Sequence, residues 1–198
     1  MLRHEQKTFI IKKTKNITAT AWQYINRKKS NIAFQLQRSD IFKHIKVANT
    51  YTQLYFHIVF AVKGRQNHIA TKWKDELYKY ISGIIANKDQ KLFIINGIPN
   101  HIHLLIGTKP NCNLSDLVRD IKANSSKWIN EKRFIKGKFE WQTGFGAFTL
   151  GQSQIPKIVN YIKNQEEHHK VQTFKEEYID FLKACEIDFK NEYIFTDE

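Results

Sequence analysis

The feature that most constrains the fold is the stretch 96–107, Asn-Gly-Ile-Pro-Asn-His-Ile-His-Leu-Leu-Ile-Gly. A Gly-Ile-Pro-Asn turn precedes alternating residues, a pattern that predicts a β-strand with His101 and His103 on one face. Two residues apart on a strand, their Cβ atoms lie roughly 6 to 7 Å apart, so both neutral rings can bind one divalent cation. Two exposed strand histidines are the other interpretation of this pair. The apolar residues expected on the opposite face are Ile102, Leu104 and Ile106.

The segments around this strand predict the rest of a sheet. Alternation from Thr52 to Val62 predicts a first strand with one strongly apolar face, and it places His57 on the opposite face as a surface or groove residue. Asn113 can cap a later helix, with Asp116 three residues on. The other expected elements are a helix over 71–87, a strand over 92–98, and a loop with a fourth strand within 141–151.

The order of these elements defines a fold class. Strand, helix, strand, strand, helix, strand is typical of a ferredoxin-like α+β sandwich, in which two helices cover one face of a four-stranded antiparallel sheet. His101 and His103 are therefore expected on the uncovered face, accessible to a metal ion.

A second group of reactive side chains is expected on the helix that follows the fourth strand. Ser153 is the expected N-cap, and Pro156 lies in the first turn, where proline costs least. At about 100° per residue, Tyr161, Gln165 and His168 share one surface of this helix. A tyrosine half-buried at a helix edge is the other interpretation. The expected core stripe of the helix is Ile155, Val159 and Ile162.

Three motifs, in this order, resemble a known family. The segment 99–106, Pro-Asn-His-Ile-His-Leu-Leu-Ile, resembles the His-hydrophobic-His motif of the HUH nucleases. More narrowly, it is similar to the single-tyrosine transposases of the IS200/IS605 type and their REP-associated relatives. Trp-Gln-Thr-Gly at 141–144 and Tyr-Ile-Lys-Asn-Gln at 161–165 extend the resemblance, which covers about residues 47–178.

The resemblance implies a site and a reaction. Tyr161 is the implied nucleophile, and Gln165 completes a site for Mg²⁺ or Mn²⁺ with His101 and His103. A phenol with a pKa near 10 is a poor nucleophile, so a cation with open positions for phosphate oxygen and water is needed to polarise the scissile phosphate. Attack yields a 5′-phosphotyrosine and a free 3′-hydroxyl. The implied substrate is single-stranded DNA with hairpin-bearing ends, and the implied assembly is a homodimer with composite active sites.

Other polar residues have two interpretations each. The basic residues Arg119, Lys122, Lys127 and Lys157 are DNA-binding candidates, and a solvated helix face is the alternative. His168 and His169 are expected to be surface histidines at a helix end, with an alternative role as ligand or proton shuttle. A final helix over 174–185 and the apolar segment 193–195 are expected to pack on a neighbouring molecule or on the back of the domain.

Positive charge is concentrated in the N-terminal part of the chain. The formal net charge is +13, of which residues 1–46 carry +9 and the remainder +4. One interpretation is a basic arm that holds DNA. The favoured hypothesis is that the natural protein starts at Val47 and that 1–46 is translated upstream sequence. The expected divisions are therefore an extension over 1–46, the catalytic domain over 47–185 and a tail over 186–198.

Composition excludes several classes. No apolar run has the length of a membrane span and no signal peptide is recognisable, so a cytoplasmic protein without a membrane partner is expected. Cys112 and Cys185 have no metal-binding spacing. Three alternatives to a transposase stay open: a domesticated REP-type hairpin nuclease, a catalytically inactive single-stranded nucleic-acid-binding module, and a replication or conjugation initiator. The short chain argues against the initiator, because such proteins normally carry a second domain.

Overall fold

The computed structural model describes residues 51–190 and Ile194. The described residues from Thr52 onward belong to one compact unit. The basic extension expected over 1–46, the proposed start at Val47, and the apolar tail residues Tyr193 and Phe195 lie outside the described residues. Within the described part of the chain, no helix combines the length and apolarity that crossing a bilayer requires.

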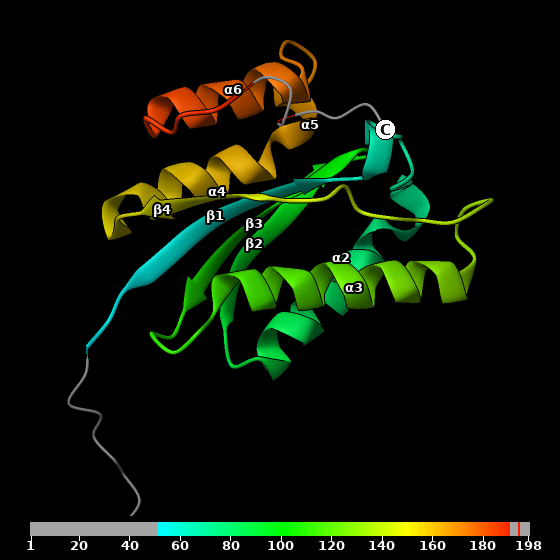
Figure 1. The fold of residues 1–198 in the computed structure, drawn as a ribbon, viewed down its shortest axis with the longest axis horizontal. Helices are drawn as coiled ribbons and strands as arrows, with labels where there is room; N and C mark the ends of the chain where they lie inside the picture. The colour runs from blue at the N-terminus through cyan, green and yellow to red at the C-terminus, as the bar shows by residue number, and fades with distance from the viewer. Residues whose placement is uncertain (1–50, 191–193, 195–198) are drawn as a thin grey trace, which may run out of the picture. The chain divides into compact units, whose positions relative to one another are not determined.

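A four-stranded antiparallel sheet forms the centre of this unit, in the order β2-β3-β1-β4 (Figure 1). The strands are β1 (Leu54–Ala61), β2 (Lys91–Ile98), β3 (His101–Thr108) and β4 (Gly146–Leu150). The helices are α2 (Thr71–Asn87), α3 (Leu114–Lys132), α4 (Ile155–Lys163), α5 (Gln165–His168) and α6 (Phe174–Ala184). The predicted α+β class, with a four-stranded antiparallel sheet and this order of strands and helices along the chain, is confirmed.

Helices α2 and α3 cover one face of the sheet and enclose the main core (Figure 1). On α2, apolar residues recur at helical spacing, and four of them are buried. The α3 helix begins as expected, because the Asn113 side chain accepts a hydrogen bond from the Asp116 backbone N–H at 3.2 Å. The buried residues of this core on α2 and β3 are Trp73, Leu77, Ile81, Ile85, Ile102, Leu104 and Ile106.

The opposite face is covered as well, so the expectation of an open histidine face is wrong. Helices α4, α5 and α6 lie on that side of the sheet (Figure 1). The physical reason is that this face is also apolar: Val59 and Phe148 pack against Phe174 and Leu182 of α6, and Leu105 packs against α4. The final helix therefore packs on the sheet, over the histidines, and not on the back of the domain.

The start and end of α4 differ from expectation. Ser153 is not the N-cap; it lies in the short 3₁₀ turn before α4, and Gln154 precedes the helix without a side-chain cap. Pro156 does lie in the first turn. The helix ends at Lys163, where the Asn96 amide of β2 donates to the carbonyls of Ile162 and Lys163, each at 3.0 Å.

Candidate active site

Both strand histidines are completely buried, and a neighbouring group fixes each ring. His101 Nδ1 donates to Asn100 Oδ1 at 2.6 Å. His103 Nδ1 lies 2.9 Å from His57 Nε2. Such partners of a ligand's second nitrogen set its orientation and tautomer. The Nε2 atoms of both rings are thereby turned toward a common point under α6, where Glu177 lies.

His57 is not the surface or groove residue that the strand pattern suggested. It is 1% exposed and stacks on His103, with the Phe181 ring of α6 against its edge. Burial, reinforced by the neighbouring His103, lowers the pKa of His57 to about 3. The imidazole is therefore neutral at physiological pH and free to act as a hydrogen-bond partner.

Glu177 is the residue that the sequence alone did not identify. It projects from α6, is 2% exposed, and its Oε2 lies 3.6 Å from His101 Nε2, 3.5 Å from His103 Nε2 and 3.4 Å from His169 Nε2. Burial opposes its ionisation, but contact with the His103 and His169 imidazoles outweighs this and holds the pKa of Glu177 well below its usual range. The sequence contained one relevant feature, an acidic residue within the otherwise apolar stripe of α6.

His169 also belongs to this cluster, so its expected place on the surface is wrong. Its side chain is 6% exposed, and its Nε2 lies 3.1 Å from His101 Nε2 and 3.0 Å from Gln165 Oε1. Gln165 is buried, as a metal ligand would be, and its Nε2 donates to Glu177 Oε1 at 3.2 Å. His168 keeps partial exposure at the edge of the cluster.

Tyr161 lies beside the same histidines, although α4 ends soon after it. Its hydroxyl donates to Glu177 Oε1 and lies 3.3 Å from His168 Nε2. Burial, followed by the charge of Glu177, raises the pKa of this phenol. The nucleophile candidate and its expected ligands therefore meet within one chain.

The cluster has the donor set of a metal centre. Potential ligand atoms of His101, His103, His169 and Glu177 all lie within 4.8 Å of one another. Two of these atoms, His103 Nε2 and Glu177 Oε2, are buried and make no hydrogen bond within the described residues. Unpartnered buried polar atoms are costly, and one divalent cation would satisfy both. The residues therefore fit the metal that the sequence predicts.

Comparison with known proteins identifies the family. The family model of IS200-like transposases matches residues 50–165. The chain belongs to this family. Transposases cut DNA and transfer its strands, so the protein is a DNA-acting enzyme by family membership.

Several relatives show how far this IS200-like transposase resembles proteins already described. It is 23% identical to the ISDra2 transposase TnpA of Deinococcus radiodurans over 120 residues, which are 58% of this chain and 86% of the relative. It is 26% identical to the IS200 transposase of Salmonella typhimurium over 130 residues, 63% and 85% of the two chains. A crystal structure of a candidate transposase from D. radiodurans R1 shares the fold, with a TM-score of 0.50 at 23% identity over 61% and 96% of the two chains.

Three of the DNA-binding candidates of this IS200-like transposase, Arg119, Lys122 and Lys127, lie on α3, across the sheet from the histidine cluster (Figure 1). Lys157 is exposed on α4. Lys127 lies 3.9 Å from Glu131, and Arg119 lies 2.5 Å from Asp116. Both contacts are exposed ion pairs, which contribute little to stability. DNA binding by these basic residues stays a prediction.

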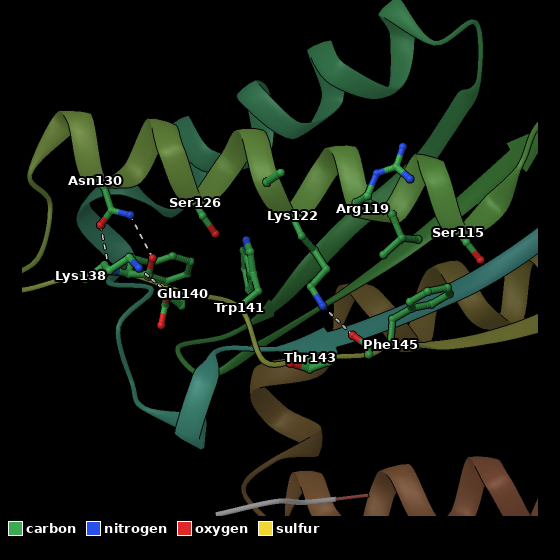
Figure 2. A pocket seen from close by; sticks show the side chains of 14 residues that line it. Ser115, Arg119, Lys122, Ser126, Asn130, Lys138, Glu140, Trp141, Thr143 and Phe145 are labelled. Carbon is green, nitrogen blue, oxygen red and sulfur yellow. Dashed lines mark hydrogen bonds and ion pairs between the residues drawn. The ribbon is translucent and has the colours of Figure 1, made fainter. Parts of the chain in front are cut away.

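Lys122 differs from the other basic residues because its ammonium group is partly buried. It donates to the carbonyls of Gln142 and Gly144 at 2.5 and 2.6 Å, in the pocket between α3 and the segment 138–145 (Figure 2). Burial lowers the pKa of Lys122 to about 8. In this structure the side chain holds the segment that leads to β4.

Proposed function

We propose that this IS200-like transposase cuts and rejoins single-stranded DNA at hairpin-bearing ends through a 5′-phosphotyrosine at Tyr161, and that it needs Mg²⁺ or Mn²⁺. The observation that carries the proposal is the position of the Tyr161 hydroxyl, which is hydrogen-bonded to the carboxylate that contacts His101 and His103. Preference for single strands and for hairpins, and a homodimer with composite sites, come from the family resemblance and stay predictions.

Each residue has a role in this reaction. His101, His103 and Gln165 would hold the cation. When bound, it supplies positive charge to the scissile phosphate and to the leaving oxygen. Tyr161 Oη forms a bond to phosphorus, the bond from phosphorus to the 3′-oxygen breaks, and that oxygen takes up a proton from solvent water to leave as the 3′-hydroxyl. Glu177 Oε1 accepts the hydrogen bond of the phenol and orients its oxygen, and the phenol proton is lost to solvent water.

A covalent-complex assay tests the proposal. The protein is incubated with end-labelled single-stranded DNA from the flanks of its own gene, with Mg²⁺ or with EDTA, and the products are separated on a denaturing gel. We expect a metal-dependent adduct that Tyr161→Phe abolishes, while DNA binding in a mobility-shift assay is unchanged. Tyr80→Phe is the matched control, because Tyr80 stacks on Trp128 on the other side of the sheet.

The outcomes separate the alternatives. An adduct with hairpin flanks but no rejoined product would favour a REP-type hairpin nuclease. Binding without any adduct would favour an inactive nucleic-acid-binding module. An adduct of undiminished yield in Tyr161→Phe would remove Tyr161 as the nucleophile.

A further inference from the structure

Two residues of the histidine cluster lie beyond the part of the chain that matches the family. The match ends at residue 165, whereas His169 follows α5 and Glu177 lies on α6. Both side chains nevertheless lie close to His101, with His169 Nε2 at 3.1 Å and Glu177 Oε2 at 3.6 Å from His101 Nε2. The centre is therefore built partly from the C-terminal helix.

Hydrogen-bond directions show which atoms in the centre carry lone pairs. His101 Nδ1 donates to the amide oxygen of Asn100, so the proton of the neutral ring lies on Nδ1 and Nε2 has a lone pair. His169 Nδ1 lies 2.8 Å from the backbone carbonyl of Gln172, which can only accept. The Nε2 of a neutral His169 therefore has a lone pair as well.

These lone pairs all face further acceptors. His169 Nε2 lies 3.1 Å from His101 Nε2, 3.0 Å from Gln165 Oε1 and 3.4 Å from Glu177 Oε2. Acceptors that converge in this way, away from water, repel one another unless a positive charge lies among them. A proton on His169 or a divalent cation can supply that charge.

Glu177 distinguishes these two possibilities. Its Oε1 already receives hydrogen bonds from Tyr161 and Gln165. Its Oε2 makes no hydrogen bond among the described residues and faces His101, His103 and His169 together. A proton on His169 Nε2 would sit on one of the three imidazole rings only. A cation would contact all three rings and Glu177 Oε2 together. Hard divalent cations also favour a carboxylate oxygen over neutral ligands.

We infer that Glu177 is an anionic ligand of the metal and His169 a further imidazole ligand, beside His101, His103 and Gln165. The inference rests on the metal site of the proposed function and extends it to α6. One carboxylate then links the two parts of the site, because Oε2 faces the metal ligands and Oε1 accepts from the nucleophile Tyr161. Docking of α6 is accordingly part of forming the metal centre.

Metal binding by the full chain without DNA tests this inference directly. Mn²⁺ affinity is measured by titration with electron paramagnetic resonance of the free ion. Glu177→Gln keeps the shape of the side chain and removes its charge, and we expect it to weaken Mn²⁺ binding by at least the roughly 10- to 100-fold typical of losing a ligand's supporting partner. His169→Ala should weaken binding in the same direction.

Glu176→Gln is the matched control. It removes one carboxylate from the adjacent, exposed position, and glutamine can replace glutamate in the capping box with Thr173. Its Mn²⁺ affinity should equal that of the unchanged protein. Thermal unfolding in EDTA establishes that the variants are folded.

Two results would overturn the inference: Mn²⁺ affinity in Glu177→Gln equal to that of the unchanged protein, or no Mn²⁺ binding by the unchanged protein. The covalent-adduct assay separates this from the proposed function. A metal-dependent adduct with Glu177-independent Mn²⁺ binding would refute only the role of Glu177. Glu177-dependent Mn²⁺ binding without an adduct on any DNA would refute only the proposed reaction.

Discussion

At the scale of single residues, the chemistry of the centre depends on groups that never face the substrate. His57 and Asn100 each hold the Nδ1 of one strand histidine, at 2.9 and 2.6 Å. For His103 to present Nε2 as a lone pair, its Nδ1 must carry the proton, so His57 Nε2 must accept it. A buried, neutral His57 with a pKa of about 3 is suited to that role at any physiological pH.

The role of His57 as a positioning residue leads to a prediction. His57→Phe keeps a flat ring and loses the acceptor, so we expect it to weaken Mn²⁺ binding about tenfold, while His57→Gln, whose amide oxygen can accept, recovers part of the loss. Calorimetric titration of Mn²⁺ into the metal-free protein measures both. Equal affinities in His57→Phe and the unchanged protein would show that His103 needs no partner.

At the scale of elements, the sequence predicted what each segment forms better than where it packs. The helix expected over 71–87 matches α2, and the helix expected over 174–185 differs from α6 by one residue. Periodicity identifies the apolar stripe of a helix but not the surface that the stripe covers. The sequence therefore gave no reason to place Glu177 over the sheet. The resemblance implied roles for Tyr161 and Gln165 because their spacing is a motif, and no motif included Glu177.

The packing of α6 against β4 is so close that one added methyl group tests it. A Cβ added at Gly146 would lie 2.8 Å from Tyr178 Cε2, closer than side chains normally pack. We expect Gly146→Ala to lower the free energy of unfolding by about 1 to 3 kcal/mol, as overpacking does, and urea unfolding measures the change.

A glycine-to-alanine substitution in α2 should change the free energy of unfolding in the opposite direction. A Cβ at Gly83, an exposed position inside α2, meets nothing within 4 Å, so Gly83→Ala should raise the free energy of unfolding by about 0.5 to 1 kcal/mol. If Gly146→Ala behaved in the same way, α6 would not be packed against β4 as described.

At the scale of the whole molecule, the centre joins segments that are far apart in sequence. His57 comes from β1, His101 and His103 from β3, Tyr161 from α4, and Glu177 from α6. Both faces of the sheet are covered, but the face toward α6 is secured by a small apolar cluster, and beneath this helix His103 Nε2 and Glu177 Oε2 lie buried without a hydrogen-bond partner among the described residues. A cation bound there would satisfy both atoms. Folding and metal binding should therefore be coupled.

This coupling predicts the effect of removing the metal on the stability of the molecule. A ligand that binds only the folded state at 100 times its dissociation constant adds about 2.7 kcal/mol, which for a chain of 198 residues corresponds to a rise in Tm of roughly 5 to 10 °C. Scanning calorimetry with saturating Mn²⁺ and with EDTA should show this difference in the unchanged protein. Tyr161→Phe should keep it, because the phenol donates to Glu177 and is not a ligand. His101→Ala should lose it, and a full shift in His101→Ala would mean that Mn²⁺ stabilises the molecule from another site.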